Sequence, residues 1–283
     1  MPRIAVVTDS TCDRGPDALA AAGVTMVPLM VHFGDGAYRD WVELTPEQFF
    51  PKLRSAAQLP TTSQPTPGDF ALVYRTLADE GAEGIVSIHL SAKLSGTVES
   101  ALMAAENSPV PVRVIDSTFV SCGMDFAIEA ACAARDTGAD LDTVEKAALD
   151  AVAESELFFV IDTLDYLVKG GRAGRSQGMA AALLNIKPIL RVTGGLIEPF
   201  KKCKGTNRAI REMAEHVAGE SRKLGPLKIV VVHAVAQNLA DELMNAIRSA
   251  GTDIAQMSCD EIGSVIGTHV GPRTVGVGYA PAR

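Results

Sequence analysis

Short apolar runs alternate with amphipathic segments through the first half of this chain of 283 residues. Strand-like apolar runs cover residues 4–8, 25–33, 84–90 and 112–115. Helix-like patterns lie between or after them, at residues 16–22, from Pro46 onward, and at 67–78, 96–106 and 123–135. Because strands that alternate with helices join through right-handed crossovers, this order predicts an α/β domain with a mostly parallel sheet and flanking helices.

The pattern changes near residue 155. Residues 188–191 and 196–203 read as two strands joined by Thr193-Gly194-Gly195, which is typical of a β-hairpin. Further strands are expected at residues 227–234, 254–259 and 274–279, with helices between them. We therefore predict two domains, an N-terminal α/β domain over residues 1–155 and a C-terminal α+β domain with a mixed sheet over residues 156–283.

Composition limits the classes of function. A net charge of −8 and only 5% aromatic residues argue against a nucleic-acid-binding surface. No apolar stretch approaches the ~20 residues that span a bilayer. No signal-peptide pattern stands at the start, so we expect a cytoplasmic protein without a transmembrane segment. The five cysteines are scattered without a CxxC, which argues against a zinc site or a disulfide framework.

Polar residues follow three of the predicted strands: Asp9-Ser10-Thr11, Ser91, and Asp116-Ser117-Thr118. The carboxyl ends of parallel strands meet at one edge of a sheet, where ligands bind in open α/β folds. These residues either line one crevice or serve as ordinary helix caps and turn formers.

Two clusters of hydroxyl residues give the sharpest functional signal: Thr62-Ser63-Gln64-Pro65 and Leu94-Ser95-Gly96-Thr97. Ser95 is expected at the start of a helix, where free amides favour an anion, and Gly96 permits close approach to the backbone. If the two clusters meet, a carboxylate or phosphate is the natural guest. Taken singly, the second cluster is better explained by a Ser N-cap without a ligand, and the first can be a capped loop before the helix at Pro67.

Two basic residues stand in glycine-rich surroundings. Arg172 lies within Gly170-Gly171-Arg172-Ala173-Gly174-Arg175, which lacks the spacings of the dinucleotide and P-loop motifs. His269 is expected in a glycine-bounded turn before the last strand. Either can pair with an anion. The other histidines are interpreted as structural, and neither a His-Ser-Asp arrangement nor a GxSxG motif stands out, so hydrolysis is weakly supported.

At these residues the chain resembles the DegV family, bacterial fatty-acid-binding proteins that act as FakB-type subunits of fatty acid kinase. The resemblance extends over about residues 3–281 as one unit. Its motifs are short but occur in family order: Val7-Thr8-Asp9-Ser10-Thr11, Thr62-Ser63-Gln64-Pro65, Leu94-Ser95-Gly96-Thr97, Val114-Ile115-Asp116-Ser117, Leu167-Val168-Lys169-Gly170-Gly171-Arg172, and Ile266-Gly267-Thr268-His269-Val270-Gly271-Pro272.

The resemblance implies a long-chain fatty acid, such as palmitate, in a tunnel between the two domains. It assigns the carboxylate to Thr62 and Ser95, with secondary positions at Gly96, Arg172, His269 and Ser117. It implies a lipid carrier rather than an enzyme, without metal or cofactor, that presents the carboxylate to an ATP-dependent kinase subunit for acyl-phosphate formation. Apolar or small residues at 157–161 and 179–184 are candidate tunnel walls.

The competing hypothesis is an enzyme that acts on a small carboxylated or phosphorylated metabolite in the interdomain cleft. The same hydroxyls, Arg172 and the strand-end acids would form its site. The two hypotheses differ in the pocket that they require, because a carrier needs an apolar tunnel and the enzyme a polar pocket.

Overall fold

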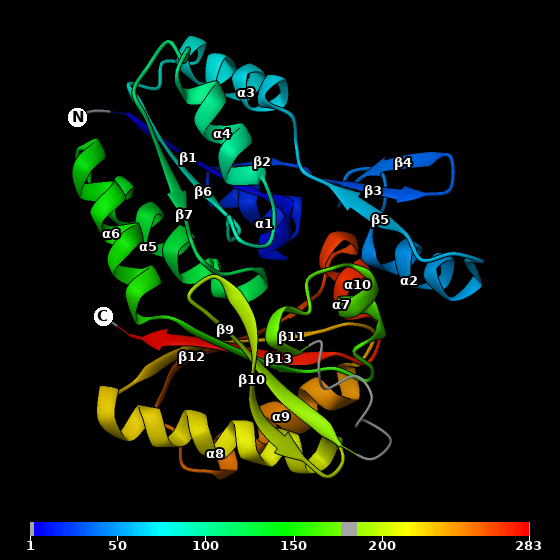
Figure 1. The fold of residues 1–283 in the computed structure, drawn as a ribbon. Coiled ribbons are helices and arrows are strands. Elements are labelled where there is room, and N and C mark those ends of the chain that lie inside the picture. Colours follow the sequence, from blue (N-terminus) through cyan, green and yellow to red (C-terminus); the bar gives the residue numbers. More distant parts are fainter. Residues whose placement is uncertain (1–2, 177–185, 283) are drawn as a thin grey trace.

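Two β-sheets lie one above the other with helices between and outside them (Figure 1). The structure, a computed structural model, describes residues 3–176 and 186–282. From top to bottom in Figure 1, helices, a sheet, helices, a second sheet and a further helical layer follow one another. This arrangement agrees with the predicted mixture of α/β and α+β structure.

The N-terminal sheet has four parallel strands in the order β2-β1-β6-β7. The strands are β1 (Ile4–Asp9), β2 (Val24–Val27), β6 (Gly84–His89) and β7 (Val112–Asp116). One face packs against α3 (Pro67–Asp79) and α4 (Thr97–Ala105), and the other against α5 (Asp125–Asp136) and α6 (Leu141–Glu154) (Figure 1). The predicted parallel sheet with flanking helices is thus confirmed.

The C-terminal sheet has six strands in the order β10-β9-β8-β13-β11-β12. Among its described strands, β11 and β12 alone pair in parallel, so the sheet is mixed, as predicted. Helices α8 (Thr206–Leu224) and α9 (Gln237–Ser249) cover its outer face (Figure 1). Its strands are β8 (Glu156–Val160), β9 (Lys187–Thr193), β10 (Leu196–Cys203), β11 (Leu227–His233), β12 (Ile254–Glu261) and β13 (Val275–Pro281).

The predicted hairpin joins β9 to β10. Gly194 and Gly195 have φ values of 55° and 82°, the left-handed conformation that a two-residue turn of this kind needs. Its tip reaches the N-terminal half of the chain, where Ser91 Oγ donates to the Gly195 carbonyl at 2.8 Å. The hairpin therefore ties the two halves together beside the ends of the N-terminal strands.

A small third sheet was not predicted. It has the antiparallel order β4-β3-β5, made of β3 (Met30–Phe33), β4 (Gly36–Arg39) and β5 (Thr61–Ser63). The expected single strand over residues 25–33 was wrong, because it divides into β2 and β3, which belong to different sheets. Pro28 lies at the division and lacks the amide that a continuous strand would need.

Short helices occupy the space where the sheets face one another. The helix α10 (Ser264–Val270) carries His269, so the predicted turn at this residue was wrong. It packs against α2 (Pro46–Ser55) and α7 (Asp165–Lys169). Further helical segments are α1 (Pro16–Ala21) and the 3-10 turns η1 (Ser10–Cys12) and η2 (Ser121–Gly123).

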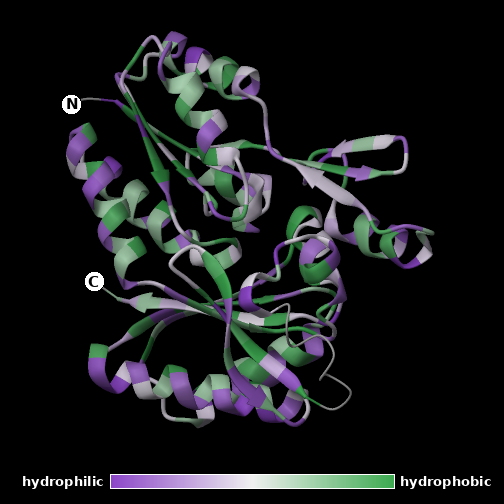
Figure 2. Ribbon diagram, in the orientation of Figure 1, coloured by the Kyte–Doolittle hydropathy of each residue, from purple (hydrophilic) through white to green (hydrophobic). Residues whose placement is uncertain are grey.

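Strand β8 separates two hydrophobic cores. Leu157 and Phe159 belong to the large core between the sheets, whereas Phe158 and Val160 belong to the core under α8 and α9. This alternation follows from the two-residue period of a strand with both faces buried. Figure 2 shows hydrophobic residues along much of the two large sheets, while α6 and α8 carry hydrophilic residues along their lengths.

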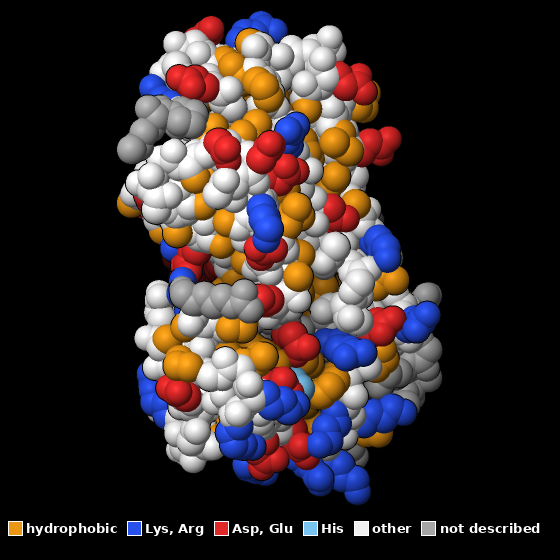
Figure 3. Space-filling model, turned by 90° about the vertical axis from the view of Figure 1, so that its left-hand side faces the viewer, with side chains coloured by type: hydrophobic (Ala, Val, Ile, Leu, Met, Phe, Trp, Pro, Cys, Tyr) orange, Lys and Arg blue, Asp and Glu red, His pale blue; other side chains and the backbone are white. Residues whose placement is uncertain are grey.

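The upper and lower parts of the molecule meet at a narrower waist (Figure 3). On the face in Figure 3, Lys and Arg side chains gather on the lower part. The described strands of the four- and three-stranded sheets precede residue 155, and those of the six-stranded sheet follow it. Division of the chain into two folding units stays a prediction.

Candidate functional site

An apolar cavity of about 290 Å³ lies between the sheets. Side chains from both halves line it, including Leu29, Leu90 and Val120 from the N-terminal half and Phe159 and Val232 from β8 and β11. Helix α10 contributes Val265, Ile266, His269 and Val270. The sequence placed candidate walls at residues 157–161, of which Leu157 and Phe159 line the cavity. The candidate wall at residues 179–184 lies outside the described residues.

Polar side chains from four segments meet at this cavity. Thr62 Oγ1 lies 2.9 Å from Nε2 of His269, within hydrogen-bonding distance. Arg172 Nε donates to the Leu94 carbonyl at 3.2 Å, which joins the glycine-rich loop to the second hydroxyl cluster. Thr62, Ser95, Arg172 and His269 all line the cavity. The structure therefore brings together four of the residues that the sequence singled out.

The two hydroxyl clusters are in contact through Gly96. A Cβ at Gly96 would lie 2.5 Å from Nε2 of Gln64, so a side chain there would displace Gln64. Ser95 lies just before Gly96, the N-cap of α4, and its Oγ is 2.9 Å from Oγ1 of Thr97. Glycine is thus required for the close approach of the two clusters.

Burial keeps His269 neutral. Loss of solvent and the nearby Arg172 guanidinium lower the pKa of His269 to about 4. Its Nε2 faces Thr62, and its Nδ1 is buried without a hydrogen-bond partner. A neutral imidazole carries one N–H, so the ring can act as a donor at one nitrogen and as an acceptor at the other.

A second cavity, of about 340 Å³, shares Thr62, Arg172 and His269 with the first. Its other lining residues include Tyr166 and Lys169. The three shared residues therefore stand at the junction of an apolar inner cavity and a more cationic outer one.

Ser117 is not brought to this cluster. It lines neither of the two cavities, and its Oγ accepts the amide of Phe119 at 3.1 Å. Asp116 likewise accepts the amides of Ala92 and Thr118. The strand-end polar groups therefore hold the loops that follow them, and apolar residues of those loops line the cavity.

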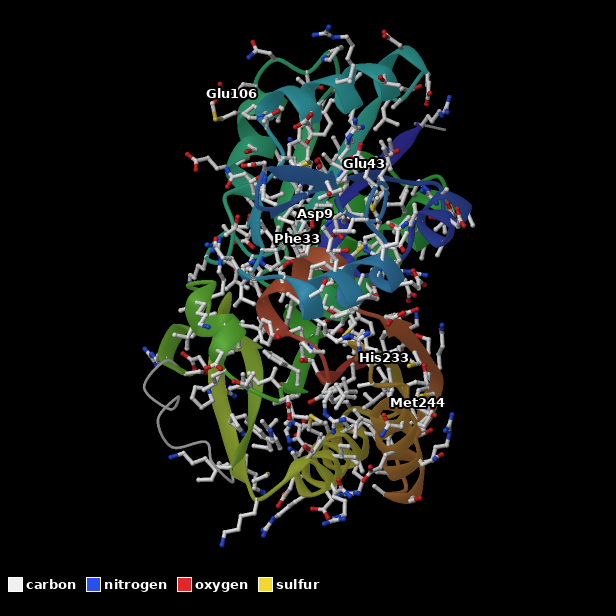
Figure 4. The ribbon with its side chains drawn as sticks, turned by 90° about the vertical axis from the view of Figure 1, so that its right-hand side faces the viewer. Asp9, Phe33, Glu43, Glu106, His233 and Met244 are labelled. Atoms are coloured by element: carbon white, nitrogen blue, oxygen red, sulfur yellow. The ribbon has the colours of Figure 1, made fainter. Side chains whose placement is uncertain are left out.

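Sequence reasoning missed a buried Asp-His-Ser array. His89 Nδ1 lies 3.0 Å from Asp9 Oδ2, His89 Nε2 lies 2.7 Å from Ser87 Oγ, and Tyr74 donates to Ser87 at 2.9 Å. All four side chains are fully buried, and none lines either cavity. In Figure 4, Asp9 lies near the junction of the two halves. The array resembles a catalytic triad in connectivity, but its serine has no access to substrate.

The family model for DegV proteins matches residues 3–282. The chain belongs to the DegV family. Within it, a DegV domain-containing protein of Streptomyces coelicolor is 38% identical, with 97% of each chain covered. A fatty acid-binding protein of Thermotoga maritima is 32% identical, with 98% of this chain and 97% of the relative covered.

A solved DegV structure agrees closely with this fold. The DegV family protein from Thermus thermophilus, which binds fatty acid, superposes with a TM-score of 0.93 at 34% identity. The comparison covers 99% of this chain and 100% of the other. The mixed α/β architecture is therefore the DegV fold. Within the described ranges, 3–176 and 186–282, no helix is both long enough and apolar enough to cross a membrane.

Proposed function

We propose that this protein binds one long-chain fatty acid, such as palmitate. The acyl chain occupies the inner cavity, and the carboxylate lies beside Thr62 and Ser95, with Arg172 and His269 close by. The observation that carries the proposal is the hydrogen-bonded polar cluster at the point where the largely apolar inner cavity meets the outer one. A narrow apolar space with a few placed donors suits a fatty acid and not a small polar metabolite.

The energetics favour retention of a long chain. Burial of ~15 methylenes at ~0.8 kcal/mol each contributes roughly 12 kcal/mol before ordering costs are subtracted. The Arg172 guanidinium supplies positive charge, and hydrogen bonds to a charged group are about twice as strong as neutral ones. The Thermotoga maritima and Thermus thermophilus relatives bind fatty acids and support the same ligand class here.

The outer cavity supports a further step, in which the carboxylate is presented to an ATP-dependent kinase subunit for acyl-phosphate formation. A carboxylate held at Thr62 would stand at the junction that both cavities share. Lys169 and Arg172 line the outer cavity and can stabilise negative charge on a phosphoryl group that approaches from that side.

Native mass spectrometry of the purified protein, followed by lipid extraction, tests the ligand. We expect one bound fatty acid, or uptake of palmitate or oleate by the ligand-free protein. Thr62→Val and Ser95→Ala should each weaken palmitate binding by about tenfold or more, because each removes a hydrogen bond to a charged group. Thr137→Val, on an exposed hydroxyl bonded to the Ala134 carbonyl, is the matched control.

A ligand-free mass that stays unchanged with both fatty acids would overturn the binding proposal. The kinase step has its own test: palmitate-loaded protein, a bacterial ATP-dependent fatty acid kinase subunit and ATP are mixed, and acyl phosphate is trapped with hydroxylamine. Trapped product from wild type that disappears with Thr62→Val supports presentation. Intact palmitate binding without trapped product for any kinase subunit supplied would count against it.

A further inference from the structure

Two aspartates of the N-terminal half hold the beginning of α10. Asp13 Oδ1 accepts the amide of Gly263 at 2.9 Å, and Asp40 Oδ1 accepts the amide of Ser264 at 3.0 Å. Ser264 Oγ also donates to the Leu44 carbonyl at 2.9 Å. These partners are 250, 224 and 220 residues apart in the sequence. The first residues of α10 are therefore fixed by the opposite half of the molecule.

The other end of the same helix carries the polar cluster. His269 faces Thr62, and Val265 and Ile266 line the inner cavity. Seven helical residues span only about 10 Å, so the helix transmits a displacement at its start directly to His269. Gly267 packs so closely on α2 that a Cβ there would lie 2.8 Å from the Phe49 ring, so α10 lies in direct contact with α2 on that side.

The contacts of Asp13 and Asp40 with Gly263 and Ser264, which form the seat of α10, also extend to the wall of the inner cavity. Ser121, which lines the inner cavity, donates to Asp13 Oδ2 at 2.5 Å. Asp13 has a φ of 61°, a conformation that costs energy for a residue other than glycine. Gly263 lies so close to the Trp41 indole that a Cβ would collide with it. Asp13 thus connects the cavity wall and α10 at a point of tight packing and backbone strain.

Both carboxyl groups are buried at a cost in stability. Asp13 is 2% exposed and Asp40 is 1% exposed, and Asp40 Oδ2 has no hydrogen-bond partner. Loss of solvent raises the pKa of Asp40 to about 7 and that of Asp13 well above its usual value. Buried carboxyl groups often destabilise a fold relative to apolar side chains, so a positioning role gives this pair a reason beyond stability.

We propose that Asp13 and Asp40 are positioning residues for the ligand carboxylate, because they seat α10 so that His269 meets Thr62. The inference rests on the fatty-acid-binding function proposed above. It assigns to the pair no contact with the ligand itself; the two carboxyl groups act through the backbone of α10.

The same seat links ligand retention to pH. If α10 leaves its seat, water reaches both carboxyl groups and their pKa values return toward normal, so seating takes up protons. The seated form, and with it ligand retention, therefore weakens as pH rises through about 7. The negative charges of Asp40 and of Asp260 of β12 raise the pKa of Asp13 further, and Asp13 in turn raises the pKa of the buried Asp125 of α5. Ser10 and Ser264 are neutral donors to Asp40. His269 is neutral throughout this range.

The test compares palmitate affinity between pH 6 and pH 8 with hydrogen exchange of residues 263–270 in the ligand-free protein. Asp13→Ala and Asp40→Ala should each lower palmitate affinity about tenfold and speed exchange of α10. Asp40→Asn keeps an oxygen acceptor but cannot ionise, so it should retain affinity at pH 6. It should also remove the part of the wild-type fall in affinity that comes from Asp40, which one proton with a pKa of about 7 limits to about tenfold between pH 6 and 8.

Asp140→Ala is the matched control, because Asp140 caps α6 through the Thr143 amide at 2.9 Å and lines neither cavity. This substitution should change neither the palmitate affinity nor the hydrogen exchange of residues 263–270. Affinities of folded Asp13→Ala and Asp40→Ala equal to wild type would overturn the inference and leave the proposed function intact. If wild type binds no palmitate, the proposed function fails. Unchanged hydrogen exchange of α10 in the variants would then also show that Asp13 and Asp40 do not hold this helix. Faster exchange would support that they do.

Discussion

His269 Nε2 lies 2.9 Å from Thr62 Oγ1, although 207 residues separate them in the sequence. Thr62 comes from β5 of the small three-stranded sheet. His269 comes from α10, which follows β12 of the C-terminal sheet in the chain. The contact closes the polar end of the inner cavity. The proposed binding of a ligand at this point therefore depends on how the two halves of the chain are held together.

Protonation of His269 is expected to destabilise the fold. Its pKa falls from 6.5 in the unfolded chain to about 4 in the folded protein, so the unfolded chain binds the proton first as pH drops. The contribution to the free energy of unfolding is complete above pH 6.5 and decreases by about 3 kcal/mol toward pH 4. Urea unfolding of wild type and His269→Gln from pH 4 to 7.5 measures it. Parallel curves for the two proteins would contradict this expectation.

Alanine at Gly170 is expected to weaken palmitate binding. A Cβ there would collide with Nδ1 of His269, which would push the ring away from Thr62. Calorimetric titration should show a loss of about tenfold or more, as for a lost hydrogen bond to a charged group.

Gly171 provides the matched control for this substitution. It has a φ of 71° and no atom within 4 Å of its Cβ position, so Gly171→Ala should cost about 1–2 kcal/mol of stability and leave palmitate affinity unchanged. Equal effects of the two alanines on binding would show that His269 is not displaced.

Two neighbouring valines of β11 should respond differently to enlargement. Val232 lines the inner cavity, so Val232→Phe fills space that the acyl chain needs and should abolish palmitate binding at little cost in stability. Val231 faces the packed core under α8 and α9, so Val231→Phe should cost about 1–3 kcal/mol. Thermal unfolding and palmitate titration of both variants check this, and undiminished binding by Val232→Phe would place the acyl chain elsewhere.

The buried array of Asp9, His89, Ser87 and Tyr74 is expected to stabilise the fold. His89→Ala leaves Asp9 and Ser87 buried without the imidazole and should lower the free energy of unfolding by about 3 kcal/mol. Tyr74→Phe removes only the terminal hydroxyl and should cost about 1 kcal/mol. Chemical denaturation distinguishes the two, and a His89→Ala protein as stable as wild type would argue against a structural role.

Much of the fold follows from local patterns in the sequence. Strands β1, β6 and β7 were predicted because continuous apolar runs ended in polar residues, and the β9–β10 hairpin because two glycines separate its strands. The hydroxyl motifs likewise marked Thr62 and Ser95, which the structure places at one cavity.

Other features depend on contacts that no local pattern encodes. Strand β5 has three residues with hydroxyl side chains, and it forms because Thr62 pairs with Val31 of β3. Helix α10 has seven residues and contains Gly267, so its sequence alone favours a turn; packing against Phe49 stabilises the helix. The pairing of Asp9 with His89 follows from the β1–β6 register, which is a tertiary property.

The position of β13 has a consequence for protein synthesis. This strand lies between β8 and β11 inside the C-terminal sheet, and α10 directly precedes it. While a ribosome is still translating residues 264–281, the sheet is divided, the cavity lacks one wall, and the β8 and β11 edges have no partner. Loading of the proposed fatty acid is therefore expected to follow translation of this region. A premature stop codon before it would yield a chain that aggregates through open strand edges.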